Sequence, residues 1–157
     1  MKTLVMIAFL GFIWSINVQA DSMHKNVPDN MIVKLSANTV TQTMDRLEKI
    51  LKSKGVTVFL RLDHAKGANK VGKNLRPTQL LIFGNPKLGS PLMMSNQTIG
   101  IDLPLKAIAW EDVTGKVWLA YNKPSYLGER HQINDKTPVI AKMTKVLNKF
   151  SSYAVGK

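Results

Sequence analysis

The sequence contains no cysteine, which excludes a disulfide bond, a thiol nucleophile and a lipoprotein anchor. Acidic residues are scarce as well: ten stand against 22 lysines and arginines, for a formal net charge of +12. Such an excess suits acidic partners, among them an acidic envelope polymer. The basic residues are scattered without interleaved aromatics, so no nucleic-acid partner is expected and a solubilising surface is the simpler interpretation.

Long apolar runs are few, and the longest lies near the N-terminus. Lys2 precedes an apolar stretch at residues 4–16, which is short for a bilayer span. The tripeptide Val18-Gln19-Ala20 then offers the small residues that signal peptidase accepts. A retained membrane anchor is the competing interpretation. We expect cleavage between Ala20 and Asp21, no stable span after cleavage, and a secreted or periplasmic protein.

The remaining chain is long enough for one domain with a core but hardly for two. We expect a signal peptide at residues 1–20, a flexible leader at 21–30 and a single compact α+β domain at 31–154. Hydrophobic periodicity predicts a strand, a helix, four strands and a helix. We expect the strands to form an antiparallel-rich sheet of about five strands with helices on one face. The expected strands lie near residues 31–35, 56–62, 80–83, 105–111 and 116–121, and the helices near 40–54 and 137–150.

Local signals mark the ends of two of these elements. Thr39 and Gln42 have the spacing of a capping box at the start of the first helix, and Gly55 is its expected stop. Gly115 is expected to take a positive φ in a hairpin that places Glu111 opposite Lys116.

Residues 75–91 form the stretch around which the predicted domain is organised. Leu80 to Phe83 are apolar at consecutive positions, which is typical of an interior strand covered on both faces. We expect Leu80 and Ile82 to be buried under the last helix, which carries Met143 and Leu147. Turn residues at 84–86 end the strand, and a short helix is expected with Ser90 as N-cap and Pro91 at its first position.

The same stretch carries a family resemblance. Leu-Arg-Pro-Thr at 75–78, Leu-Leu-Ile-Phe-Gly-Asn-Pro at 80–86 and Gly-Ser-Pro-Leu-Met at 89–93 resemble the bacterial domain of unknown function 302 family. The likeness covers about residues 31–150 and includes Asp63-His64, 100–104, 110–112 and Arg130-His131. It implies a compact α+β domain with β-α-β-β-β-β-α order, similar to the TATA-binding-protein-like folds. It implies no established activity.

Few residues could carry catalysis or hold a metal. His64 and His131 could meet in space, and Met93 or Met94 could add a soft ligand for copper, but no local metal-binding spacing supports this. Asp63 and His64 are adjacent, so their side chains would point apart on an extended chain. The favoured hypothesis is thus a non-catalytic binding or accessory module. The alternative is a small envelope hydrolase, or a copper- or haem-binding protein that uses both histidines.

Binding of a small anionic ligand is the favoured hypothesis. The expected helix start at Ser90-Pro91 would expose unpaired N–H groups, and Arg76 could add a positive charge. We expect Arg76, His64 and the backbone around Gly89 to line one cleft. The competing interpretation is that Arg76 pairs with Asp63 or Asp102. No cofactor or oligomeric state is predicted, and the candidate residues are His64, Arg76, Thr78, Gly84, Asn85, Lys87, Gly89, Ser90, Trp110, Tyr121, Tyr126, Arg130 and His131.

Overall fold

Five antiparallel strands form one sheet in the spatial order β1-β5-β4-β3-β2. The computed structural model describes residues 27–156, so the predicted signal peptide and most of the predicted leader lie outside the described residues. The strands are β1 (Met31–Ser36), β2 (Thr57–Asp63), β3 (Thr78–Gly84), β4 (Leu105–Glu111) and β5 (Val117–Asn122). The predicted α+β class and five-stranded antiparallel sheet are confirmed.

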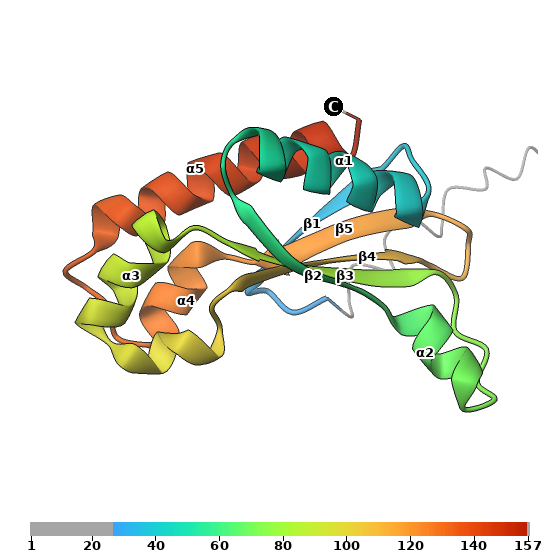
Figure 1. Ribbon diagram of the computed structural model, residues 1–157, viewed down its shortest axis with the longest axis horizontal. Helices are drawn as coiled ribbons and strands as arrows, with labels where there is room; N and C mark the ends of the chain where they lie inside the picture. The colour runs from blue at the N-terminus through green and yellow to red at the C-terminus, as the bar shows by residue number, and fades with distance from the viewer. Residues whose placement is uncertain (1–26, 157) are drawn as a thin grey trace, which may run out of the picture.

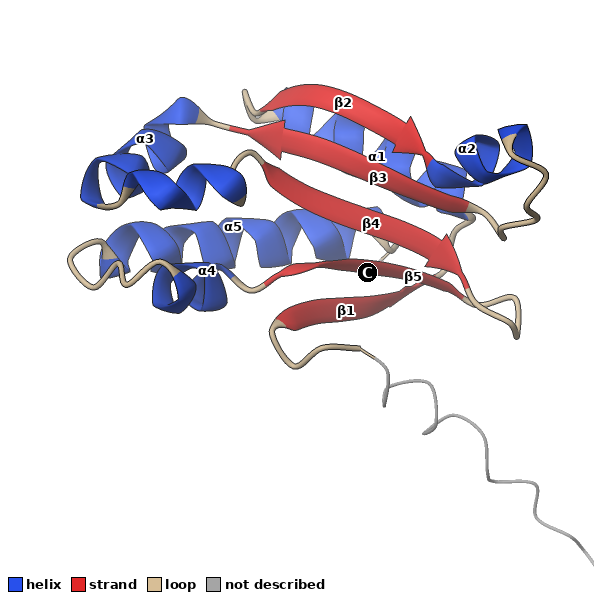
Figure 2. Ribbon diagram, turned by 90° about the horizontal axis from the view of Figure 1, so that it is seen from below, coloured by secondary structure: helices blue, strands red, loops and turns tan. Residues whose placement is uncertain are grey.

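Two long helices, α1 (Val40–Ser53) and α5 (Thr137–Ala154), lie side by side on one face of this sheet (Figure 1). Shorter helices extend beyond its two ends. One end carries α2 (His64–Lys70), and the other carries α3 (Pro86–Ser95), the 3₁₀ helix η2 (Gln97–Ile101) and α4 (Pro124–Arg130) (Figures 1 and 2). The predicted order of strands and long helices is therefore confirmed, with short helices in the connections. In the described part of the chain, no helix is both long enough and apolar enough to cross a membrane.

The local signals at the first helix and the hairpin are confirmed. Thr39 and Gln42 form the reciprocal capping box at the start of α1. Gly55 and Gly115 have φ values of +68° and +78°, which L-residues with a side chain rarely adopt. The expected pair of Glu111 and Lys116 is wrong, because Glu111 lies opposite Val117 in the ladder.

The core lies between the sheet and the α1 and α5 helices. On β3, Leu81 and Phe83 are buried in it, whereas Leu80 and Ile82 are only partly buried. The prediction that Leu80 and Ile82 lie under the last helix is therefore wrong. Successive strand residues face opposite sides, and the long helices cover one side only, so the apolar run of β3 supplies both the core and an open sheet face.

The helix after β3 begins earlier than expected. Asn85 is its N-cap and accepts a hydrogen bond from the Lys87 N–H at 2.9 Å, and Pro86 occupies the first turn. Ser90 and Pro91 lie inside α3, so the prediction that they start the helix is wrong. A polar cap followed by proline occurs twice in this stretch, and the helix starts at the first of the two.

Candidate functional site

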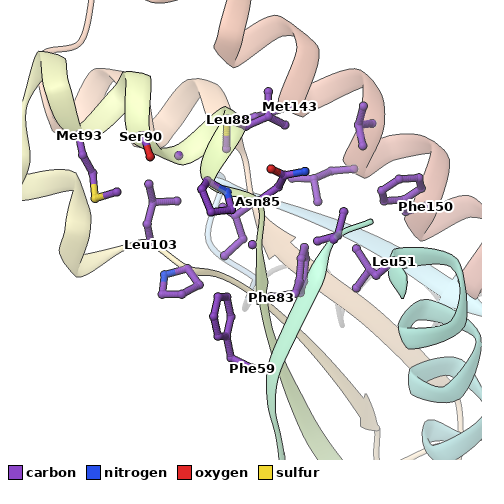
Figure 3. A pocket seen from close by; sticks show the side chains of 18 of the residues that line it. Leu51, Phe59, Phe83, Asn85, Leu88, Ser90, Met93, Leu103, Met143 and Phe150 are labelled. Carbon is purple, nitrogen blue, oxygen red and sulfur yellow. The ribbon is translucent and has the colours of Figure 1, made fainter. Parts of the chain in front are cut away.

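A cavity of about 370 Å³ opens where α3, α5 and the ends of β2 and β3 meet (Figure 3). Its volume falls in the range of about 300–1,000 Å³ that is typical of small-molecule sites. The lining residues come from segments far apart in the sequence: Leu51, Val56, Phe59, Phe83, Gly84, Asn85, Pro86, Leu88, Gly89, Ser90, Met93, Gly100, Leu103, Pro104, Leu105, Met143, Val146, Leu147 and Phe150.

The end of β3 and the turn into α3 position one wall of the cavity. Phe83 is the last inward-facing residue of β3, and the chain then turns at Gly84 and Asn85 into the helix. A Cβ atom on Gly84 would lie 3.4 Å from Cβ of Pro104 and 3.5 Å from the Phe59 ring, so Pro104 and Phe59 pack directly against this turn. The opposite wall is the inward stripe of α5, where Figure 3 shows Met143 and Phe150.

The cavity is open to solvent on one side. Phe59 is 56% exposed and Met93 is 37% exposed although both belong to the lining. Gly89 faces the space from α3, and a Cβ atom there would meet only the Leu103 side chain, at an ordinary contact distance of 3.6 Å. A flexible apolar molecule could therefore enter between these side chains.

The lining is almost entirely apolar. Its polar side chains are those of Asn85 and Ser90, and no charged side chain belongs to it. The Asn85 side chain also caps α3 through the Lys87 N–H. A buried anion requires a fixed positive charge or several free N–H groups, which this lining does not offer. The cavity suits a hydrocarbon group, in contrast to the anion expected from the sequence.

The predicted site residues fall into separate groups. Gly84, Asn85, Gly89 and Ser90 line the cavity, and Lys87 lies in the same first turn of α3. Arg76, Thr78 and His64 lie near the other end of β3, because that strand runs from Thr78 to Gly84 and its neighbour β2 ends at Asp63. Seven extended residues span about 20 Å. The single cleft expected from Arg76, His64 and Gly89 is therefore not formed.

Arg76 pairs with neither Asp63 nor Asp102, the two carboxylates considered from the sequence. Its Nε donates a hydrogen bond to the backbone carbonyl of Glu111 at 3.1 Å, which joins the start of β3 to the end of β4. Asp63 instead caps α2 by accepting from the Lys66 N–H at 2.9 Å. Asp102 is bound to His131. Arg76 thus bonds to backbone instead of either carboxylate.

His131 links two of the short helices. Its Nε2 lies 2.7 Å from Oδ2 of Asp102 and its Nδ1 lies 2.9 Å from Oγ1 of Thr98, so both ring nitrogens are engaged. The Asn96 side chain donates to the His131 carbonyl at 2.8 Å, and Arg130 lies 3.4 Å from Asp102. These contacts connect α4 with the residues around η2.

A shared site of the two histidines is not formed. His64 starts α2 and His131 follows α4, at opposite ends of the sheet. Met93 faces the apolar cavity and Met94 is exposed. Within residues 27–156, no group of three or more histidine, aspartate or glutamate side chains could hold a metal.

The predicted aromatic residues do not line one wall. Tyr121 is buried beneath α5, where its hydroxyl accepts a hydrogen bond from Ser151 at 3.3 Å and burial raises its pKa. Trp110 lies opposite Trp118 on the open sheet face. Tyr126 packs beside the smaller apolar cluster of α3, η2, α4 and α5.

Sequence reasoning missed most of the lining. Leu51, Leu103 and Phe150 come from three separate segments, and each follows an apolar pattern that indicates only a buried position. The cavity exists because the packing between them is incomplete. No local pattern reports incomplete packing, so only the α3 portion of the wall had a signal in the sequence.

The fold and the cavity define a small α+β domain with an apolar pocket at one end of an antiparallel sheet. The chain belongs to the family described as Domain of unknown function DUF302, whose model matches residues 31–150. The resemblance noted from the sequence is thereby confirmed.

Curated relatives from Brucella carry a functional name. The chain is 40% identical over 144 residues to proteins named Fluoride-specific ion channel FluC 1 from Brucella suis biovar 1 (strain 1330) and Brucella abortus biovar 1 (strain 9-941). The match covers 87% of this chain but 57% and 53% of those proteins. The chain therefore spans about half the length of the curated relatives it matches.

A solved structure shows the same fold. It is the crystal structure of an uncharacterized conserved protein DUF302 from Bacillus stearothermophilus, with a TM-score of 0.65 and 20% sequence identity. The match covers 82% of this chain and 97% of that one. At this identity the likeness concerns the fold alone.

Proposed function

We propose that this domain is a non-catalytic binding module of the cell envelope whose cavity takes the hydrocarbon part of a small amphiphile, such as a fatty acid. The observation that carries this proposal is the cavity of about 370 Å³, which has an apolar lining and is open to solvent beside Phe59 and Met93. The secreted or periplasmic location expected from the N-terminal segment is consistent with such a module.

The chemistry of the lining supports a chain with a polar head. Burial of each methylene group contributes about 0.8 kcal/mol, or roughly fourfold in affinity, until the cavity is full. The lining offers a polar head group only the Ser90 and Asn85 side chains as partners. The head group would therefore have to remain in contact with solvent at the mouth of the cavity. The net charge of +12 favours an anionic head.

The experiment is a titration of the purified chain with saturated fatty acids of eight to sixteen carbons, read by displacement of an apolar fluorescent dye. We expect affinity to rise with chain length and then level off. Gly89→Leu should weaken binding at least tenfold, because its side chain would enter the cavity. The fold should survive, since leucine favours a helix over glycine by up to about 1 kcal/mol.

Gly67→Leu is the matched control. Gly67 also lies inside a helix, and a Cβ atom there would meet nothing within 4 Å, but α2 lies at the far end of the sheet. This variant should bind as the parent does. Equal binding by both variants, or affinity independent of chain length, would contradict the proposed site.

Sodium fluoride serves as a second probe because of the names of the Brucella relatives. We infer that the half they share with this chain acts as an accessory module beside their other half. Fluoride should then raise the melting temperature no more than chloride at equal ionic strength. A rise specific to fluoride would favour an ion-binding role over the apolar ligand.

A further inference from the structure

We propose that the open face of the sheet, opposite α1 and α5, is an interface at which a second copy of this chain docks face to face. Figure 2 views the molecule from the side where the strands lie in front of α1 and α5. Side chains at directly paired positions of neighbouring strands share a face, so the ladder register identifies the residues that this surface presents.

One row of the register is apolar across all five strands. Val33 pairs with Ala120, Ala120 with Ile108, Ile108 with Leu80 and Leu80 with Leu62. This row spans about 20 Å, since neighbouring strands lie about 4.8 Å apart. Leu62 at its end is 40% exposed, whereas Ala120 on β5 is buried.

The flanking rows are apolar over most of their length. On one side Leu35 pairs with Trp118 and Trp118 with Trp110, and the row ends at the polar, uncharged Thr78. On the other side Lys106 pairs with Ile82, and Ile82 with Leu60. Leu35 and Leu60 are 45% and 49% exposed. Among the paired residues of these three rows, Lys106 carries the only charge.

The charge distribution favours an apolar partner surface. The chain has a net charge of +12, yet Lys106 is the one charged residue among the paired positions of these three rows. Two copies of this basic chain would repel each other in most relative orientations. A contact made through an almost uncharged face minimises that repulsion. The same face of a second copy is also apolar and would bury both sets of side chains at once, as a two-fold symmetric contact does.

The area of the face is sufficient for such a contact. Five strands at about 4.8 Å and six residues at about 3.3 Å give roughly 24 by 20 Å, or about 480 Å² of flat face per copy. Two copies would bury about 1,000 Å², and the relief of the side chains adds to this. Specific interfaces begin at about this size, so the dimer should dissociate on dilution.

The test is sedimentation equilibrium of the purified chain over a wide concentration range. We expect the apparent mass to rise from one chain to two, together with a blue shift of the emission from Trp110 and Trp118, which lie on this face. Ile108→Lys on the central strand should raise the dimer dissociation constant by about 100-fold or more, because like charges would meet across the contact.

Two further variants keep the result decisive. Leu62→Lys changes a partly exposed position of the same face and should also weaken the dimer. It replaces Ile108→Lys as the test if that variant does not fold. Val71→Lys makes the same charge change at a position that is 72% exposed beyond α2 and should leave the dimer intact. A single-chain mass at every concentration, or a dimer that both face variants leave unchanged, would overturn the proposal.

Discussion

At the residue scale, Asp112 holds the hairpin between β4 and β5 together. Its carboxylate accepts hydrogen bonds at 2.7–3.1 Å from the Thr114 backbone and hydroxyl, the Lys116 backbone and the Trp118 indole. Burial of this carboxylate raises its pKa, but these hydrogen bonds outweigh burial and lower the pKa to about 2. The folded state therefore favours the ionised form of Asp112.

We expect Asp112→Asn to lower the free energy of unfolding by about 1–3 kcal/mol at pH 7, because a donor replaces one acceptor oxygen. A carboxyl group in the unfolded chain has a pKa near 3.9. The stabilisation by ionised Asp112 is thus complete above that pH and lost as the pH falls toward about 2. Urea unfolding of both proteins between pH 7 and pH 2 measures this.

The difference between the parent and Asp112→Asn should narrow below about pH 4. Asp29→Asn removes the same charge from an exposed residue and is the control. A difference that stays constant down to pH 2 would mean that the negative charge of Asp112 contributes nothing to stability.

At the scale of elements, β3 divides its side chains between two environments. Leu81 is completely buried against the helices, and its neighbour Leu80 lies on the open face. Leu81→Ala should cost about 2–5 kcal/mol, since it leaves a cavity in the core, whereas Leu80→Ala should cost about 1 kcal/mol or less. Chemical unfolding at a dilution where the chain is monomeric compares the two. Equal losses would contradict the assignment of one covered and one open face.

The sequence predicted these elements well for a physical reason. Periodicity reports which residues of a strand or helix are apolar, and caps such as Thr39 mark where a helix begins. Periodicity does not report which element, if any, covers an apolar face. For this reason the sequence pattern assigns Leu80 and Ile82 to the core. The start of α3 was misplaced because Asn85-Pro86 and Ser90-Pro91 carry the same signal, and only packing selects between them.

At the scale of the whole molecule, the candidate site depended on which ends of the sheet meet. His64 and Arg76 were expected beside Gly89 because all three follow or precede strands. The antiparallel path of β2 and β3 separates them by a strand length. The cavity itself joins residues from Leu51 to Phe150, so it could be located only after the three-dimensional packing was known.

The N-terminal segment decides where the whole chain is located. We expect the exported form to begin at Asp21, because Val18-Gln19-Ala20 closes the N-terminal apolar stretch. N-terminal sequencing of material from the periplasm or medium checks this. An intact Met1 recovered with the membrane fraction would show instead that the segment is retained as an anchor. Ala20→Arg should block cleavage and is the control for processing at this bond.

The pairing of the first strand with the last has a consequence for biosynthesis. Met31 of β1 pairs with Asn122 of β5, and Lys34 of β1 donates hydrogen bonds to Asn148 of α5. A ribosome releases the N-terminal strand long before its partner exists, so native closure of the sheet must wait until nearly the whole chain has been made. The nascent chain therefore lacks the closed native sheet during most of its synthesis. An unfolded chain is the form that a secretory translocon transports.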